Sequence, residues 1–396
     1  MSDRHAETMR IHLADDTIDA DELAALCRWI QSGSRLTKGE LTREFEDDFS
    51  RYIGAPHAVF VNSGSSANLL MLYVLDVLGE LRNRRVVAPA ISWSTTVAPA
   101  MQLGMEIELC DCDRTTLGLD PQHFEALCRE HKPAAAIVVH VLGHACQLEP
   151  IRSICAEHEV ILIEDACEAL GTRSQGRLLG THGVMGSFSF YYGHQLSTIE
   201  GGVLAVSERR LYNTLLSLRA HGWARDLDPA YKKSWEQEFA VDEVRSLYTF
   251  YYPGFNFRPT DLQAFLGLSQ MRKAARVVET RQRNFELYRE ALGGDFWCQT
   301  SDTEQLSSFA FGTLVANRLE VFQHLRQRGV ESRPLVCGNI GRQPFWIRRY
   351  GELALPNADL VHEYGIYLPN HAGLSPTDVG YVTEAFREVA VPKPWG

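Results

Sequence analysis

The sequence predicts an α/β fold in which a large domain is built on a mostly parallel sheet and a smaller C-terminal domain is of the α+β class. Three observations lead to this fold class. The chain has 396 residues, enough for two domains with sizeable cores. Hydrophobic residues make up 45% and charged residues 22%, proportions that exclude a disordered or fibrous chain. Between residues 58 and 207, short apolar runs alternate with amphipathic stretches, which is typical of βα units on a parallel sheet.

Seven apolar runs are the expected strands of the sheet. In chain order they read AVFVNSG, VVAPAIS, MEIELCD, AAAIVVHVLG, VILIEDA, GSFSFYY and GGVLAVS. The intervening stretches 66–78 and 121–130 have the periodicity of amphipathic helices. Functional groups in such sheets gather at the carboxyl ends of the strands, where helix N-termini converge. We therefore expect the functional site in the residues that follow these runs.

The C-terminal third is predicted to begin with one long helix, over residues 261–292, that joins the two domains. A small α+β unit follows it, with strands SSFAFGTLV and ESRPLV, the helix VFQHLRQRG and a final helix near 378–389. The predicted large domain is therefore 1–260, with an N-terminal helical segment, and 261–396 holds the linking helix and small domain. The charged segment 226–246 is expected to be an irregular surface excursion.

Charge and cysteine usage limit the possible partners and compartment. The formal net charge is −11 and no long Lys/Arg block occurs, so we expect no nucleic-acid or membrane-binding surface. The N-terminus MSDRHAETMR lacks the apolar stretch of a signal peptide, and we expect a cytoplasmic protein. The nine cysteines show no paired CxxC and are expected to be reduced. Cys110 and Cys112 form a CxC pair without a second ligand cluster, so we expect no metal.

Two strand ends carry the first candidate site residues. Ser63-Gly64-Ser65-Ser66-Ala67-Asn68 follows the strand AVFVN and opens a helix, where small residues and free N–H groups suit a phosphate. A simple helix cap and tight turn would use the same residues. Asp165 ends the run ILIED, and a carboxylate at a buried strand end can pair with a protonated ring nitrogen of a cofactor. A capping or surface acid is the alternative.

A third motif, GSFSFYYGHQL followed by EGG, completes a set that resembles a known family. From about residue 30 to near the C-terminus, the chain resembles the DegT/DnrJ/EryC1/StrS sugar aminotransferases, which are fold-type I pyridoxal 5′-phosphate (PLP) enzymes. The matching pieces are TKGELTREFE, NSGSSANLL, APAISWSTT, IEDACEALG, GSFSFYYGHQL, EGG, LRAHGW and PGFNFRPTDLQA. The resemblance implies a large PLP-binding domain with a seven-stranded sheet and a smaller C-terminal domain.

The chain departs from the aminotransferases at His194. In that family a lysine stands at this position and binds the cofactor covalently. The six lysines here are Lys38, Lys132, Lys232, Lys233, Lys273 and Lys393, and none lies in that motif. A histidine at this place resembles the small dehydratase branch of the family, and the resemblance makes His194 the expected catalytic residue. The alternative is a structural histidine whose ring nitrogens have hydrogen-bond partners within the protein.

The resemblance implies a reaction in dideoxysugar biosynthesis, of the kind that supplies lipopolysaccharide O-antigens. A PLP/PMP-dependent 3-dehydratase (PMP, pyridoxamine 5′-phosphate) would remove the C3 hydroxyl of a nucleotide-linked 4-keto-6-deoxy sugar, with glutamate as amino donor and release of ammonia. An imidazole, with an unperturbed pKa of about 6.5, suits the required proton transfer at the cofactor C4′ carbon. GDP-4-keto-6-deoxy-D-mannose is the expected substrate, although the residues leave GDP, TDP and CDP open.

Further roles follow from the resemblance, position by position. Asp165 would pair with the pyridine nitrogen, Trp93 would stack on the ring, and Gly64, Ser65 and Ser189 would hold the phosphate. Glu168 replaces a residue that is commonly Gln in the family and would lie near the ring oxygen.

Asn256 would reach the phosphate from a second subunit, which implies a homodimer with shared sites. Arg258 would bind the donor carboxylate and His221 the donor or sugar. The alternatives are purely structural roles, with Trp93 packed in a core and Asn256 in a turn.

Three other functions compete with this prediction. A nucleotide-sugar 4-aminotransferase would need a lysine in the motif around His194, and none of the six is there. An iron–sulfur dehydratase would need clustered cysteines, but after Cys167 the next ones are Cys298 and Cys337. A non-catalytic PLP-binding regulator would keep the cofactor site and turn over no sugar.

Overall fold

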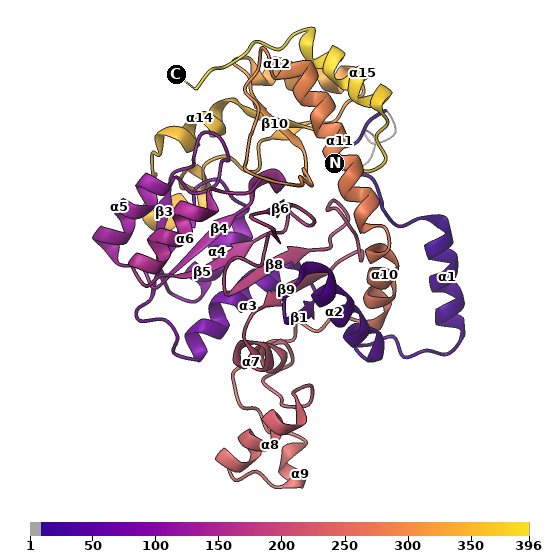
Figure 1. Cartoon of the computed structure of the whole chain (residues 1–396), viewed down its shortest axis with the longest axis vertical. Coiled ribbons are helices and arrows are strands. Elements are labelled where there is room, and N and C mark those ends of the chain that lie inside the picture. Colours follow the sequence, from indigo (N-terminus) through magenta and orange to yellow (C-terminus); the bar gives the residue numbers. More distant parts are fainter. Residues whose placement is uncertain (1–8, 396) are drawn as a thin grey trace.

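A computed structural model describes residues 9–395 of the chain, and Figure 1 shows its architecture. The stretch on which the signal-peptide expectation rests lies mostly outside these residues. Within the described range, no helix is both long enough and apolar enough to span a membrane.

A seven-stranded sheet forms the centre of the larger part of the molecule, as predicted. Its spatial order is β1-β9-β8-β5-β4-β2-β3, and β9 alone runs against the other strands. The seven apolar runs of the sequence supply these strands: β1 (His57–Val61), β2 (Arg85–Pro89), β3 (Glu106–Cys110), β4 (Ala135–Val139), β5 (Ile161–Asp165), β8 (Met185–Ser189) and β9 (Gly202–Val206). The short pair β6 (Arg173–Ser174) and β7 (Arg177–Leu178) lies outside this sheet.

Both faces of the sheet are buried, which explains why the strands read as nearly continuous apolar runs. In β5, Ile163 belongs to the core on one face and Leu162 to the core on the other. The first core is closed by α3 (Gly64–Val77), α4 (Ser94–Gln102) and α7 (Arg209–Arg219). The second is closed by α2 (Glu40–Ile53), α5 (Pro121–His131), α6 (Leu148–Glu157) and α10 (Asp261–Met271). The predicted helices at 66–78 and 121–130 are α3 and α5.

The C-terminal part has its own core around a three-stranded antiparallel sheet, ordered β10-β12-β11. Its strands are β10 (Phe311–Leu314), β11 (Arg333–Pro334) and β12 (Gly365–Leu368). Its helices are α11 (Ala274–Leu292), α12 (Arg318–Gln327), α13 (Pro344–Tyr350), α14 (Pro356–Tyr364) and α15 (Pro376–Arg387). This agrees with the predicted α+β class. The boundary at 260/261 stays a prediction.

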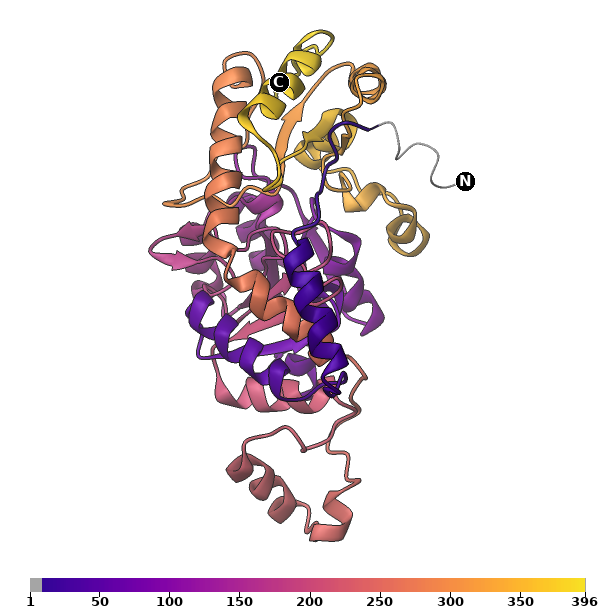
Figure 2. The ribbon, with the colours of Figure 1, turned by 90° about the vertical axis from the view of Figure 1, so that its right-hand side faces the viewer.

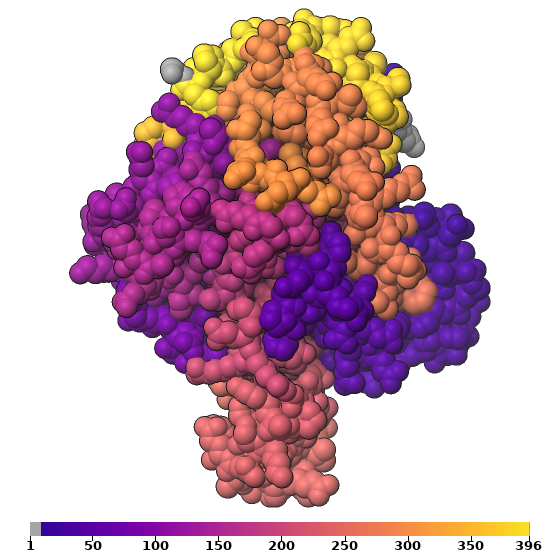
Figure 3. Space-filling view, viewed as in Figure 1, coloured from indigo at the N-terminus to yellow at the C-terminus, as the bar shows by residue number. Residues whose placement is uncertain are grey.

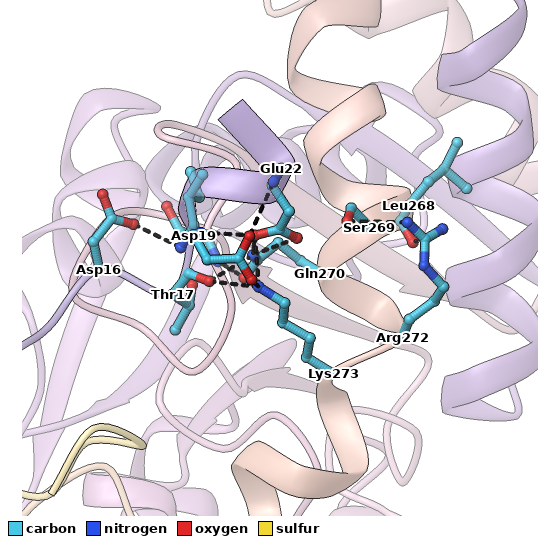
Figure 4. Close-up of polar contacts among 11 residues, drawn as sticks. Asp16, Thr17, Asp19, Glu22, Leu268, Ser269, Gln270, Arg272 and Lys273 are labelled. Carbon is cyan, nitrogen blue, oxygen red and sulfur yellow. Dashed lines mark hydrogen bonds and ion pairs between the residues drawn. The ribbon is translucent and has the colours of Figure 1, made fainter. Parts of the chain in front are cut away.

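The prediction of a single helix over 261–292 is wrong. The helix is interrupted at Arg272–Lys273, between α10 and α11. The amides of these two residues bond three positions back, to Ser269 and Gln270, which tightens the turn. The Lys273 ammonium then binds the start of α1 (Ala20–Gln31), contacting the Thr17 carbonyl and the carboxylates of Asp19 and Glu22 (Figure 4). The break therefore coincides with the attachment of α1.

Gln270 extends this attachment toward the loop after β8. Its side-chain nitrogen donates to both carboxylate oxygens of Glu22, at 3.0 and 2.8 Å (Figure 4). Its side-chain oxygen accepts from the Ser197 amide at 3.3 Å. Helix α1 is thus connected through one buried side chain to the loop that carries His194.

The segment 226–246 is a surface excursion, but it is helical rather than irregular. It contains α8 (Pro229–Glu238) and α9 (Glu243–Ser246), which form an arm projecting from the body (Figures 1 and 2). Asp228 and Asp242 cap the two helices, and Pro229 starts the first. The space-filling view shows the same arm standing clear of the rest of the chain (Figure 3).

Candidate active site

Several backbone ends converge on the carboxyl end of β5, the middle strand of the sheet. They are the first turns of α3 and α4, the last residue of β8, and the loops that follow β4, β5 and β8. The first turn of a helix presents unpaired N–H groups and the positive end of the helix dipole. The topology therefore collects anion-binding backbone groups around the last residue of β5, Asp165.

Asp165 is buried and held from three elements. Its Oδ2 accepts hydrogen bonds from the Asn68 amide of α3 at 2.8 Å and from the Thr96 hydroxyl of α4 at 2.7 Å. Its Oδ1 accepts from the Cys167 backbone N–H at 3.1 Å. Every one of these partners donates, so the carboxyl group is held as an acceptor. Such a carboxylate suits a protonated nitrogen.

Gly64, Ser65 and Ser189 lie together at the start of α3. A Cβ at Gly64 would stand 2.8 Å from Cβ of Ser189, so only glycine allows the start of α3 to approach the end of β8 this closely. The Ser65 hydroxyl lies 2.8 Å from that of Thr95, in the first turn of α4. Hydroxyls and helix N–H groups thus surround one small space, as a phosphate requires.

Trp93 is the N-cap residue of α4 and exposes 59% of its surface. Trp93 is therefore not part of a core of this chain, and its predicted stacking on a cofactor ring stays a prediction. The preceding residue, Ser92, is buried, and its carbonyl accepts a hydrogen bond from the Cys337 thiol at 2.8 Å. The small domain therefore contacts the segment that carries Trp93.

His194 lies in the loop after β8, with its ring 5.3 Å from that of Phe309 of the small domain. Its Nδ1 is buried without a hydrogen-bond partner among the described residues. Burial and the nearby Arg281 guanidinium lower the pKa of His194 to about 4, although Asp165 opposes the shift. The imidazole is therefore neutral at physiological pH, which a proton acceptor requires.

Glu168 is half-buried in the loop after β5. Its Oε2 accepts from the Leu142 backbone N–H at 2.7 Å, in a turn where Leu142 adopts a left-handed backbone with φ of 51°. Burial raises the pKa of Glu168 to about 7, with a further contribution from Asp165. A carboxyl group with a pKa near neutral pH is suited to acid–base catalysis.

The remaining candidates, His221, Asn256 and Arg258, form a second group at the base of the arm. The Ala220 and Asn256 backbones pair as an isolated bridge, and the His221 amide donates to the Phe255 carbonyl at 2.6 Å. Arg258 helps to line a surface cavity of about 140 Å³ that also contains Arg35, Lys38, Trp223, Arg225 and Asp226. Within residues 9–395, no side-chain hydrogen bond or ion pair connects this group with the first one.

A model of the DegT/DnrJ/EryC1/StrS aminotransferase family matches residues 16–387. The chain belongs to this family.

Two curated relatives in the family are dehydratases. GDP-4-keto-6-deoxy-D-mannose 3-dehydratase of Yersinia pseudotuberculosis is 32% identical over 373 residues, covering 91% of this chain and 93% of the relative. The dTDP-4-dehydro-2,6-dideoxy-D-glucose 3-dehydratase of Saccharopolyspora spinosa is 32% identical over 377 residues, covering 89% of this chain and 81% of the relative.

Solved structures show the same fold. The GDP-4-keto-6-deoxy-D-mannose-3-dehydratase of E. coli with bound hydrated PLP has a TM-score of 0.87 and 28% identity, covering 96% of this chain and 99% of the other. A structure of GDP-4-keto-6-deoxymannose-3-dehydratase with a trapped PLP–glutamate geminal diamine has a TM-score of 0.86 and 27% identity, with coverages of 95% and 100%. The fold-type I architecture is therefore confirmed.

The lysines of this family member lie outside the His194 motif. Lys38 forms an ion pair with Asp226 at 2.9 Å, and Lys273 binds the start of α1. The other four lie on or beside α5, α8 and the C-terminal segment: Lys132, Lys232, Lys233 and Lys393. In the described part of the chain, no lysine forms a hydrogen bond or ion pair with Asp165, Glu168 or His194. This agrees with the absence of a lysine from the His194 motif.

Sequence reasoning missed the side chains that support this family site. Asn68 and Thr96 hold Asp165, and both lie in the motifs NSGSSANLL and ISWSTT, so their spacing from strand ends was an available signal. Arg281 had no such signal, because it belongs to a helix rich in Arg and Glu, and an arginine on such a helix is normally exposed.

Proposed function

We propose that the protein is a PLP/PMP-dependent 3-dehydratase that removes the C3 hydroxyl of a nucleotide-linked 4-keto-6-deoxy sugar. The observation that carries the proposal is His194, a neutral imidazole in the loop where this family places its lysine, in a motif that contains no lysine. An enzyme without that lysine has no amine to tether the cofactor or to complete amino transfer to the sugar. The remaining base is suited to dehydration.

The residues around Asp165 fit the cofactor. The first turn of α3 has the N–H groups for a phosphate, and a Cβ at Gly64 would fill the space beside Ser189. Ser65 and Ser189 supply hydroxyls there. Asp165, with all its partners donating, would hold the ring nitrogen protonated, and the exposed Trp93 ring would cover one face. Glu168 would lie near the ring oxygen.

His194 would take a proton from the C4′ carbon of the bound cofactor. PMP supplies an amine for the 4-keto group and a conjugated ring that accepts electrons from the C4′–H bond. The imidazole can then return this proton to the departing C3 hydroxyl, which leaves as water. One glutamate is consumed for each sugar, and one 2-oxoglutarate and one ammonia are released, so the product sugar has one oxygen atom fewer.

We also propose the nucleotide and the donor. The dehydratase relatives act on a GDP-sugar and a dTDP-sugar, as their names state, and one solved relative holds PLP joined to glutamate. GDP-4-keto-6-deoxy-D-mannose is our first choice for this chain, because the GDP-sugar enzyme matches it over the larger share of both chains. Arg258 would bind the glutamate carboxylate through its planar guanidinium, and His221 would contact the donor or the sugar.

We also propose a homodimer with shared sites. In the described residues no side-chain hydrogen bond joins Asn256 or Arg258 to the group around Asp165, although the Phe257 carbonyl between them accepts from the Asn62 amide at 3.1 Å. In a dimer, Asn256 of one subunit would reach the phosphate in the site of its neighbour. A two-fold arrangement would complete both sites at once.

Product analysis tests the proposed function. The purified protein is mixed with PLP, glutamate and, in turn, GDP-, dTDP- and CDP-linked 4-keto-6-deoxy sugars, and each product is measured by mass spectrometry. We expect loss of one oxygen from the sugar, stoichiometric ammonia and preference for the GDP substrate. His194→Asn is the control, because it keeps a side chain of similar size without a base, and it should lose about 10²–10⁴-fold in rate.

Other products would identify the competing functions. A 4-amino sugar that keeps its C3 oxygen would show an aminotransferase. Cofactor binding without turnover of any of the three substrates would show a regulator. An activity unchanged in His194→Asn would contradict the role of His194.

A further inference from the structure

Arg281 of α11 is a buried cation without a counter-ion. Its side chain is 2% exposed, and no carboxylate lies within ion-pair distance in the described part of the chain. Its guanidinium donates instead to backbone carbonyls, those of Phe309 at 3.0 Å, Ser308 at 3.3 Å and His194 at 3.5 Å, and also to that of Asn370. One cation therefore joins the His194 loop to two segments of the small domain.

This arrangement is costly, because a buried charge without an opposite charge loses its hydration and gains only carbonyl dipoles. Burial accordingly lowers the pKa of Arg281 to about 10, at which the group is still charged at neutral pH. A neutral amide would avoid the charge, but it has only two N–H donors for the four carbonyls. The Arg281 side chain thus both fixes these segments and places a buried charge near the site.

The guanidinium charge acts on the imidazole of His194. The guanidinium carbon lies 5.8 Å from the Phe309 ring centre, and the Phe309 ring lies 5.3 Å from the His194 ring. Arg281 is itself buried, so the field of its guanidinium is less screened than it would be in water. No acidic side chain stands between the two groups in the described structure.

We propose that Arg281 is a positioning residue that fixes the His194 loop and, through its uncompensated charge, keeps the His194 imidazole unprotonated. This inference rests on the proposed role of His194 as a base. A protonated imidazole cannot accept the C4′ proton, and Asp165 at the end of β5 favours protonation. The charge of Arg281, on α11, opposes this effect of Asp165 on the imidazole.

The charged groups around the imidazole have opposing effects. Burial and Arg281 lower the pKa of His194, while Asp165 and the Cys167 backbone raise it. Tyr191 of the same loop has its ring centre 6.5 Å from that of His194. Arg281 also lowers the pKa of His371, beyond the effect of burial, while Asp15 raises it. His371 therefore serves as an internal second reporter of the same charge.

Histidine titration tests the proposal without any sugar turnover. The full-length protein is labelled at the histidine ring carbons, and its NMR signals are followed with pH, both with PLP and after cofactor removal. His194→Asn identifies the His194 signal by its loss. Arg281→Gln removes the charge, but its side-chain amide can still donate to a carbonyl. Arg281→Lys keeps the charge but loses the planar set of guanidinium N–H donors.

We expect the parent His194 to titrate well below its usual range. Arg281→Lys should leave that value low, and Arg281→Gln should raise it by about one unit, the size expected for a nearby charge in a weakly screened site. The Arg281→Gln enzyme should lose activity toward acidic pH, with the midpoint following the new His194 titration.

Three results would overturn the proposal. One is a parent His194 that titrates at its ordinary value, which decides the matter even if Arg281→Gln does not fold. Another is a folded Arg281→Gln protein with unchanged His194 titration. The third is an equal upward shift in the Lys and Gln variants, which would make the effect one of hydrogen bonding. Failure of the dehydratase assay would leave these titrations interpretable, so the two proposals fail separately.

Discussion

The Asn68 side-chain amide donates a 2.8 Å hydrogen bond to Oδ2 of Asp165. The Asn68 carbonyl oxygen in turn accepts from the Ser187 hydroxyl at 2.5 Å. One residue on α3 thereby ties the ends of β5 and β8 together, and all three side chains are buried. The carboxylate proposed to face the cofactor nitrogen is thus fixed by residues that do not face the cofactor themselves.

Thr96→Val removes one of the two hydrogen bonds to Oδ2 of Asp165 with little change in shape. We expect PLP and PMP to bind about tenfold more weakly, because a hydrogen bond to a buried carboxylate contributes about 1.5 kcal/mol. Absorbance or fluorescence titration of the cofactor measures this. Thr383→Val on α15, whose hydroxyl bonds within its own helix, is the matched control and should bind normally. Equal affinities for both variants would contradict the role of Asp165.

Gly64→Ala should disturb the proposed phosphate site, since its Cβ would meet Ser189 at 2.8 Å. We expect a loss of about 1–3 kcal/mol in the free energy of unfolding, together with weaker cofactor binding. Gly380→Ala on α15 is the control, because no atom lies within 4 Å of the place that its Cβ would occupy. That variant should gain about 0.5–1 kcal/mol, as expected for alanine in a helix. Urea denaturation of the two variants compares them directly.

Glu168 should make the stability of the protein depend on pH. Its pKa is raised from 4.5 to about 7 by burial, so the folded protein binds the proton more tightly than the unfolded chain. The stability from this group is present below about pH 4.5 and is lost as the pH rises to about 7. Glu168→Gln should therefore be more stable than the parent at pH 8, by about 1–2 kcal/mol, and nearly equal to it at pH 4.5.

Urea denaturation at the two pH values measures this difference. Glu304→Gln, at an exposed carboxylate that accepts from the Gly176 amide, is the control for replacing a carboxylate by an amide. A Glu168→Gln difference that is the same at both pH values would show that packing, not ionisation, governs this position.

Mixed subunits test the proposed homodimer. A His194→Asn chain and an Asn256→Ala chain are each expected to have low activity, but a heterodimer of them has one intact site. Random exchange should restore about a quarter of the parent activity, since half of the dimers are mixed and half of their sites are intact. Turnover after refolding the mixture measures this. No gain above the sum of the separate chains, or an active monomer in sedimentation, would contradict shared sites.

The sequence predicted the sheet well because its signal is strong and local. Buried runs such as that of β5 are apolar throughout and end in polar residues, and the site residue Asp165 stands at that transition. The break at Arg272 escaped prediction because the amphipathic pattern continues through it, and the contact that accompanies it joins Lys273 to Glu22, 251 positions away. Long-range contacts of this kind leave no periodic trace in a sequence.

The arm and Arg281 illustrate two different errors. The helices of the arm carry ordinary capping signals at Asp228 and Asp242, which a high content of charged residues obscured. Arg281 offers no local signal, because an arginine on an amphipathic helix is normally exposed. Its burial results from the docking of the small domain, which the sequence indicates only as a separate unit.

The link from Glu22 through Gln270 to Ser197 has a practical consequence for anyone who shortens this chain. A version that begins after α1 would keep the sheet and every residue proposed to face the cofactor. It would nevertheless remove Glu22, the partner that holds the Gln270 side chain. The hydrogen bond from the Ser197 amide to Gln270 would then be weakened. Loss of turnover in such a truncation would report a loosened loop, and helix α1 would be mistaken for part of the catalytic apparatus.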